Sequence, residues 1–153
     1  MTTTKKARTT QNDKAYEGFL QSLELVSLAL RSCSSQLNRD AYFDITFGKN
    51  RKALRSLRDT YSVTSFDETY FEAEGRFALT VSSGTDDPPV LMIEFVYEIH
   101  MHGKPPLSKE MADRFTKSEL RLILIPFARQ FISTLSAQMA IPPVLIPLAA
   151  GGK

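Results

Sequence analysis

The sequence has a single cysteine, Cys33. One cysteine excludes a disulfide framework within the chain, which is typical of a protein from a reducing compartment. No apolar run approaches the roughly 20 residues that a membrane-spanning helix needs. The first residues are polar, so we expect no signal peptide. Together these features predict a cytoplasmic protein without membrane insertion.

Neither sign of charge dominates, because 19 basic and 17 acidic residues give a net charge of +2. That balance does not by itself indicate nucleic-acid binding. Hydrophobic residues make up 42% of the chain and charged residues 24%, which is enough for a packed core. We expect one domain, 14–149, between a disordered basic tail, 1–13, and a short flexible end, 150–153.

Catalytic and metal-binding motifs are also missing. The sequence has no GxGxxG, Walker or GxSxG pattern, and no nucleophile–base pair can be named. His100 and His102 would share one face of a strand, but with Glu94 or Glu98 they would form only a weak metal site. Cys33 has no CxxC partner, so we expect a small, partly buried residue. The sequence therefore predicts no enzyme, no cofactor and no metal site.

The N-terminal half shows weaker periodicity. A short helix is predicted over 15–22. Residues 23–30 alternate as a strand with a one-residue shift at Val26 that indicates a β-bulge, although a helix also fits this segment. Residues 41–48 predict a second strand. The basic stretch 49–59 is expected to be a solvated connection, with a short amphipathic helix as the alternative.

The clearest pattern is a pair of long alternating segments, 70–83 and 90–102, joined by a turn over 84–89. Two such strands predict an antiparallel hairpin with one apolar and one polar face. The apolar rows are Phe71, Ala73, Phe77, Leu79 and Val81, followed by Leu91, Ile93, Phe95, Tyr97, Ile99 and Met101.

The C-terminal third predicts a long helix that ends near Ala140. Thr116 and Glu119 have the spacing of a capping box before an apolar run. The apolar stripe that follows is wider than one sheet face needs, so its surplus should contact another subunit or a ligand. Pro126 predicts a kink or a later helix start. The prolines of 142–149 exclude a helix interior and a central strand there.

The run 122–149 resembles a segment of SecB-type export chaperones, in which an (I/L)-x-P-(F/Y)-A-R motif opens the main helix and an apolar, Pro-containing segment follows it. Residues 19–38 also look like the opening of SecB-like proteins, and the predicted hairpin lies where that family has its central strands. The matching motif residues here are Ile125, Pro126, Phe127, Ala128 and Arg129, followed by Pro142, Pro143, Leu145 and Pro147.

This resemblance implies an α+β fold, a four-stranded antiparallel sheet with a long C-terminal helix packed on one face. It implies a homo-oligomer, dimer or tetramer, with helices at its interfaces, for which Ile125, Ile132 and Met139 are candidates. It also implies an ATP-independent holdase for unfolded polypeptides, either export preproteins or the antitoxin of a toxin–antitoxin–chaperone system.

This chain departs from the SecB family pattern in two respects. They leave open whether a translocase motor is one of its partners. Export SecB proteins are acidic, whereas this chain is slightly basic. We also expect neither the second C-terminal helix nor the zinc-binding tail of that family, because little sequence follows Ala149.

Exposed apolar side chains would bind such clients by removing their apolar surface from water. The candidates are Phe43, Phe71, Phe77, Phe95, Tyr97, Leu145 and Ile146. The same alternating apolar residues could instead be ordinary core residues that contact no client. Two other functions stay open: a small-molecule or lipid-binding module, and a nucleic-acid-associated regulatory protein that uses 49–58 and the basic tail.

Overall fold

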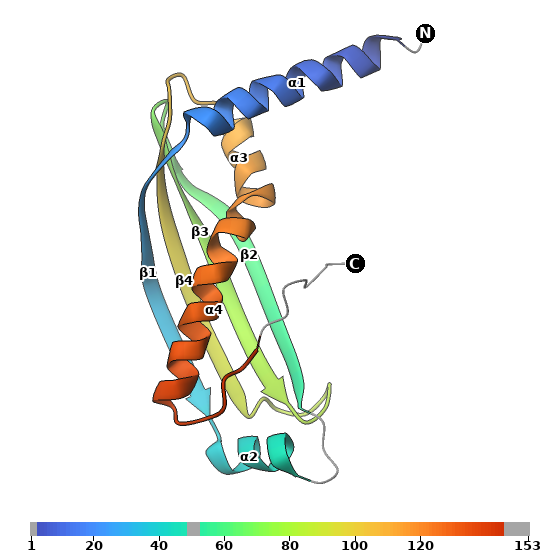
Figure 1. Cartoon of the computed structure of the whole chain (residues 1–153), viewed down its shortest axis with the longest axis vertical. Helices are drawn as coiled ribbons and strands as arrows, with labels where there is room; N and C mark the ends of the chain where they lie inside the picture. The colour runs from blue at the N-terminus through green and yellow to red at the C-terminus, as the bar shows by residue number, and fades with distance from the viewer. Residues whose placement is uncertain (1–2, 49–52, 146–153) are drawn as a thin grey trace.

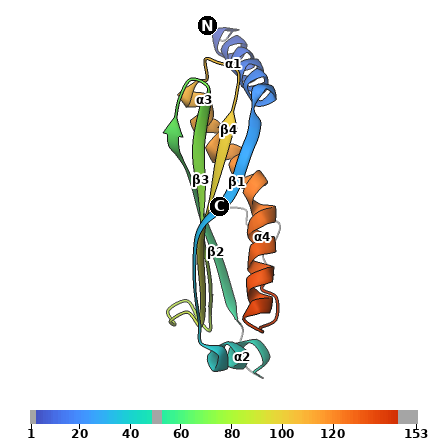
Figure 2. The ribbon, with the colours of Figure 1, turned by 90° about the vertical axis from the view of Figure 1, so that its left-hand side faces the viewer.

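The computed structural model describes residues 3–48 and 53–145, with side chains from Asp13 onward. Four antiparallel strands form one sheet in the order β1-β4-β3-β2, and α3 and α4 lie on one face of it (Figure 1). Seen from the side, no described helix covers the other face (Figure 2). The predicted fold class is confirmed. The elements are α1 (Thr3–Ser22), β1 (Glu24–Leu37), α2 (Arg39–Phe47), β2 (Leu54–Phe66), β3 (Tyr70–Ser82), β4 (Leu91–His102), α3 (Lys109–Ser118) and α4 (Leu120–Gln138).

The β3–β4 hairpin confirms the strongest sequence prediction. Its register places Phe77 opposite Phe95, so the two apolar rows share one face of the sheet. That face is the one covered by the helices, since Phe95 contacts Phe131 of α4. The rings of Phe77 and Phe95 stack with centroids 4.9 Å apart. Every member of both rows is buried, because the helix layer seals this face of the sheet.

β1 is an edge strand, so the alternative helix for 23–30 is wrong. The predicted bulge is confirmed, since the register shifts between Leu25 and Ser27. A second shift falls between Leu30 and Ser32. Cys33 is exposed rather than partly buried, as is nearly all of β1, because the described helices leave both faces of this edge strand largely uncovered.

The predicted strand 41–48 is wrong, because these residues form α2. Asn38 caps this helix by accepting a hydrogen bond from the Ala41 N–H. The buried pair is Tyr42 and Ile45, three residues apart, which is the spacing of one helix face. The apparent alternation of apolar residues there was therefore a misleading signal.

The prediction of a solvated connection over 49–59 is also wrong for the part of this segment that the structure describes. β2 begins at Leu54, and residues 49–52 lie outside the described residues. Arg55 and Arg58 lie on opposite faces of β2, because their spacing is odd. This edge strand supplies the fourth strand of the sheet, in place of the one predicted over 41–48.

α1 begins at Thr3, within the segment for which the sequence predicts a disordered tail. Tyr16 and Phe19 from its C-terminal half join the core. The Arg114 guanidinium of α3 lies over the Tyr16 ring, 3.9 Å from its centroid. The domain boundaries themselves stay a prediction.

The predicted capping box does not start a helix. Thr116 lies inside α3, where its hydroxyl donates to the Ala112 carbonyl. The cap of α3 is Ser108, whose side chain accepts from the Met111 N–H. The break between α3 and α4 falls at Glu119. α4 begins at Leu120 with Pro126 inside it, so the alternative of a later helix start is wrong.

α4 approaches the sheet closely at Gly75, in the middle of β3. A Cβ atom there would lie 2.5 Å from Leu124 Cδ1 and 3.0 Å from Tyr61 Cε1. The residues of α4 that are buried against the sheet recur at every fourth position: Leu120, Leu124, Ala128, Ile132 and Ser136. The absence of a side chain at Gly75 therefore sets the depth at which α4 packs.

α4 ends in a tight reversal at Ala140. The Ile141 N–H donates to the Ser136 carbonyl, and the Ala140 N–H donates to the Ala137 carbonyl. Ala140 has a φ of 53°, which is the left-handed conformation that favours glycine at this position.

We expect Ala140→Gly to raise the free energy of unfolding by about 1 kcal/mol, because it removes the left-handed strain of a residue with a Cβ. Chemical denaturation would measure this change. Ala137→Gly is the matched control, since Ala137 is an exposed residue inside α4. It should lower stability by about 1 kcal/mol. Equal destabilisation by both changes would contradict the assigned strain.

Candidate functional site

Apolar side chains are exposed on the flank where β1 lies beside α4. Leu30 of β1 is 40% exposed and lies directly opposite Tyr97 of β4. Phe127 of α4 is 45% exposed, and its ring centroid is 6.4 Å from that of Tyr97. The Tyr97 hydroxyl also donates a hydrogen bond of 3.4 Å to the Phe127 carbonyl. Tyr97 therefore connects the edge strand to the helix.

The same flank continues toward the C-terminal end of α4. Cys33 lies opposite Phe95, and the Phe95 ring centroid is 4.8 Å from that of Phe131. Phe131 is partly buried, so part of it still faces solvent. We call the whole surface the β1–α4 strip. It consists of Leu28, Leu30, Cys33, Tyr97, Phe127 and Phe131.

The β1–α4 strip contains no charged side chain. Between Leu25 and Leu37 the only charged residue of β1 is Arg31, and its guanidinium is bonded to Glu98 on the other face of the sheet. Between Leu122 and Gln138 the only charged residue is Arg129. An exposed, uncharged apolar surface of this kind is typical of a binding site for other apolar groups.

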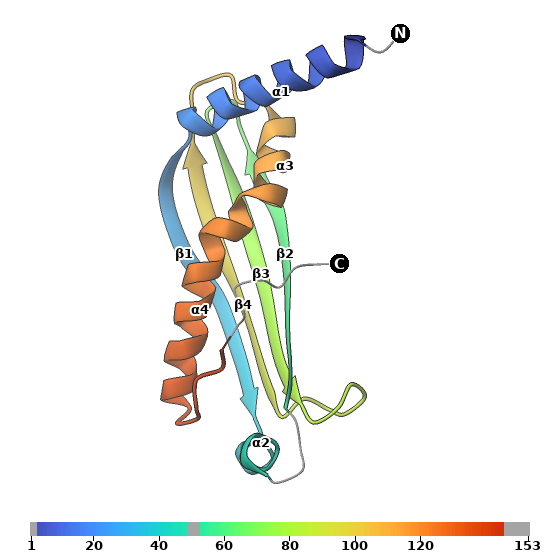
Figure 3. The ribbon, with the colours of Figure 1, turned by 45° about the vertical axis from the view of Figure 1, so that its right-hand side comes forward.

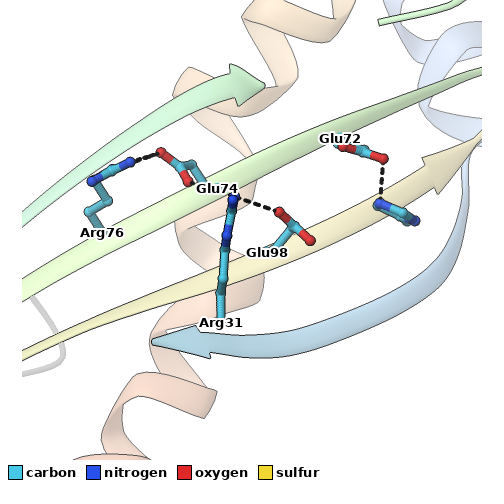
Figure 4. A network of polar contacts seen from close by, with 6 residues as sticks. Arg31, Glu72, Glu74, Arg76 and Glu98 are labelled. Carbon is cyan, nitrogen blue, oxygen red and sulfur yellow. Dashed lines mark hydrogen bonds and ion pairs between the residues drawn. The ribbon is translucent and has the colours of Figure 1, made fainter. Parts of the chain in front are cut away.

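Charged residues gather instead on the uncovered face of the sheet (Figure 4). Glu74 lies directly opposite Glu98 and is only 4% exposed. Arg31 pairs with Glu98 at 3.0 Å and with Glu74 at 3.8 Å, and Arg76 pairs with Glu74 at 2.6 Å. Like charges that face each other across two strands repel, and these arginines offset that repulsion at the centre of the sheet.

We expect Arg31→Met to lower the free energy of unfolding by about 1 kcal/mol, because it leaves two carboxylates facing each other. Adding Glu98→Gln should recover most of that loss, since it removes the repulsion. A double-mutant cycle by chemical denaturation measures the coupling. Additive effects of the two changes would show that the ion pair contributes nothing.

The two histidines lie on this uncovered face as predicted. His100 Nε2 lies 2.6 Å from Glu72 Oε1, and His102 stacks on Tyr70. Within the described residues, no group of three or more His, Cys, Asp or Glu side chains is arranged to hold a metal ion. None of the described helices is both long and apolar enough to span a membrane.

A partly buried polar cluster fixes α4 to the other edge strand. Asp59 of β2 accepts hydrogen bonds from the Tyr61 hydroxyl at 2.8 Å and from Arg121 Nε at 2.7 Å. Burial raises the pKa of the Tyr61 phenol, and the hydrogen bond to Asp59 raises that pKa further. The phenol therefore stays neutral at physiological pH, and this cluster is a structural contact.

Several predicted client-binding residues lie in the core. Phe71, Phe77 and Phe95 are at most 2% exposed, and Tyr97 is 8% exposed. Only the tyrosine reaches the β1–α4 strip. The sequence could not make this distinction, because a core row and a binding row have the same alternation.

The other predicted client-binding residues lie outside the strip. Phe43 of α2 is 37% exposed and stacks with Phe47, with ring centroids 5.8 Å apart. Leu145 is 75% exposed in the segment after α4. Ile146 lies outside the described residues.

The predicted interface and motif residues are divided between core and surface. Ile132 and Ala128 are fully buried against the sheet, whereas Ile125 and Met139 are partly buried. For Arg129, Nε and Nη2 are buried and have no hydrogen-bond partner among the described residues. The motif prolines are likewise divided: Pro126 and Pro143 are exposed, and Pro142 is partly buried.

Sequence reasoning missed Leu30, Phe131 and Cys33 as surface residues of one strip. The alternation of β1 did place Leu28 and Leu30 on one face, and the wide stripe of α4 included Phe127 and Phe131. What was missing was the neighbour relation, since only the sheet order places β1 beside β4.

No protein-family model matches the sequence, and no curated protein matches it either. Solved structures do match. One is a Mycobacterium tuberculosis SecB-like chaperone, Rv1957, in complex with a ChAD peptide from the HigA1 antitoxin. The TM-score is 0.69 at 14% sequence identity, and the match covers 85% of this chain and 93% of that chain.

A second match is a Streptococcus agalactiae protein of unknown function. Its TM-score is 0.47 at 11% identity, over 82% of this chain and 97% of that chain. The mycobacterial match extends over most of both chains. This chain has the SecB-like fold.

Proposed function

We propose that this protein is an ATP-independent holdase that binds exposed apolar stretches of unfolded polypeptides and catalyses no reaction. The observation that carries this proposal is the β1–α4 strip, an uncharged apolar surface formed by side chains between the edge strand β1 and α4. The SecB-like fold supports it. A cytoplasmic location fits an exposed, unpaired Cys33, which a reducing compartment keeps as a thiol.

The binding energy would come from removing apolar surface from water, at about 25 cal/mol per Å² before ordering costs. Leu30 and Phe127 offer exposed aliphatic and aromatic surface without a charge to desolvate. Because apolar burial has no preferred direction, many client sequences would be accepted.

We further propose that the clients include an antitoxin segment or export preproteins. The mycobacterial neighbour was solved with an antitoxin peptide, which supports polypeptide clients for this fold. An interaction with a translocase motor would require a partner surface elsewhere, for which the uncovered sheet face is the open area.

The edge of β1 supports a homo-oligomer, either a dimer or a tetramer. Edge strands of monomers are usually protected by charges or prolines. The other edge, β2, carries Arg55, Arg58 and Asp59, whereas β1 carries only Arg31 after its first residue. We propose that β1 pairs with a second copy. The exposed residue Leu122 of α4, at 71%, supports a further contact between helices.

The test is suppression of aggregation. Purified protein is mixed with thermally unfolding citrate synthase without nucleotide, and light scattering is followed at increasing molar ratio. The proposal predicts suppression near a stoichiometric ratio by a dimer or tetramer. A stable monomer without effect on aggregation would contradict it, and binding of a co-purified small molecule or of nucleic acid would favour the alternative functions.

A further inference from the structure

The described chain ends in a short segment that lies against its own helix layer. After the reversal at Ala140, residues Ile141–Leu145 run back beside α4 over the helix-covered face of the sheet (Figures 1 and 3). We call these five residues the strap. The strap belongs to no helix or strand.

The strap is held mainly by two apolar side chains. Ile141 is 5% exposed and Val144 is 4% exposed, whereas Pro143 and Leu145 between and beyond them face solvent. Two buried residues at a spacing of three are typical of an extended, polyproline-like segment with three residues per turn.

Backbone hydrogen bonds contribute nothing to the strap beyond its first residue. Pro142 and Pro143 have no N–H group. No backbone hydrogen bond joins residues 142–145 to the rest of the described chain. Within the described residues, the one backbone hydrogen bond of the strap runs from the Ile141 N–H to the Ser136 carbonyl, and it belongs to the end of α4. The apolar surface beneath the strap thus holds an extended segment by side-chain burial alone.

We propose that the surface under the strap is a binding site for an uncharged, extended client segment with apolar residues three apart, and that the strap is its resident occupant. This proposal rests on the holdase function. The strap has this chemistry itself, with no charge between Gln130 and Leu145. Since the site needs no N–H donor from its occupant, proline-containing segments fit it.

Occupation by the strap would lower the apparent affinity for clients. A client that enters this site must first displace Ile141 and Val144. If only a fraction of the molecules has the strap displaced, the apparent affinity for the client falls in proportion to that fraction. The strap would thereby keep the apolar surface covered until a client is present.

The test uses a buried thiol as a reporter. In the full-length variant Cys33→Ser/Val144→Cys, the introduced thiol replaces a side chain that is 4% exposed, so its alkylation by iodoacetamide should be slow. The client is reduced, carboxymethylated α-lactalbumin, which is unfolded and has no free thiol. At saturating client we expect the alkylation rate to rise at least tenfold.

A control sets the scale of that rate. Cys33→Ser/Leu145→Cys places the thiol at a position that is 75% exposed, so it should be alkylated rapidly without client. Client binding is measured independently by fluorescence anisotropy of the labelled client. If the client binds but the rate at position 144 stays slow, the strap proposal fails and the holdase function stands. If the client binds neither this variant nor the wild-type protein, the holdase function fails, and the strap proposal fails with it.

A second variant tests the affinity. Val144→Ser weakens the burial of the strap, so we expect the client to bind about tenfold more tightly, together with a small fall in Tm. Val26→Ser is the matched control, because Val26 is 58% exposed and lies outside both surfaces. A fall in Tm with unchanged or weaker client binding would show that Val144 is only a core residue, and would overturn the proposal.

Discussion

Phe127→Asp is expected to weaken binding of an unfolded client at least tenfold. Phe127 is the most exposed aromatic side chain of the β1–α4 strip, at 45%. A factor of ten corresponds to about 1.4 kcal/mol, which is within the range for burial of a phenylalanine side chain. The aspartate would also place an unpaired charge against an apolar client. Fluorescence anisotropy of labelled, carboxymethylated α-lactalbumin measures the dissociation constant.

The fold should tolerate this substitution. The packing that is lost is the contact between the Phe127 and Tyr97 rings, which is worth about 1 kcal/mol. Ser133→Asp is the matched control on the same helix, because Ser133 is exposed and six residues at 100° each place it about 120° away from Phe127 around α4. Its binding to the client should stay close to that of the wild type. Equal losses for both variants would place the client on α4 without involvement of the strip.

Gly75→Val should destabilise the protein by about 3 kcal/mol. The added side chain would overlap Leu124, whose Cδ1 lies 2.5 Å from the Cβ position, so the fully buried Leu124 side chain or α4 itself would have to shift. Overpacking of this kind costs about 1–3 kcal/mol, and Tyr61 on the adjacent strand blocks a sideways escape. Chemical denaturation measures the loss.

Ala78→Val is the control for the effect of valine in β3. Ala78 lies on the uncovered face of the same strand, where no described helix packs, so valine should be neutral or stabilising through its strand propensity. If Gly75→Val were as stable as this control, the close packing of α4 on β3 would be wrong.

The β3–β4 hairpin could be predicted from the sequence because its burial pattern is regular. One face of each strand is covered by α1, α3 and α4 together and the other is not, so alternation of apolar residues follows directly. The same regularity explains why Gly75 did not stand out: a glycine on the apolar face of a strand marks a close approach, but only the position of α4 shows what approaches.

The edges of the sheet could not be predicted as well. β2 carries Arg55 and Arg58 among its apolar residues because both of its faces are partly exposed, so its alternation is weak. In α2 the apolar residues Phe43, Ile45 and Phe47 alternate by chance. The helix is stabilised by its cap and by the buried Tyr42, which are tertiary effects that a periodicity count ignores.

The candidate site was predictable only in part. The resemblance of the C-terminal third to SecB-type proteins gave the fold, and the wide apolar stripe of α4 correctly indicated surplus surface at Phe127. The burial of Phe71, Phe77 and Phe95 depends on how the helices pack across the sheet, since Phe71 contacts Phe19 of α1 and Phe115 of α3 while Phe95 contacts Phe131 of α4.

The central claim is tested most directly by a binding titration without nucleotide. Increasing amounts of the protein are added to labelled α-lactalbumin in two forms, native and reduced carboxymethylated, and anisotropy is recorded. We predict saturable binding of the unfolded form and none of the native form. No binding of the unfolded form, or equal binding of both forms, would contradict a holdase that recognises exposed apolar segments.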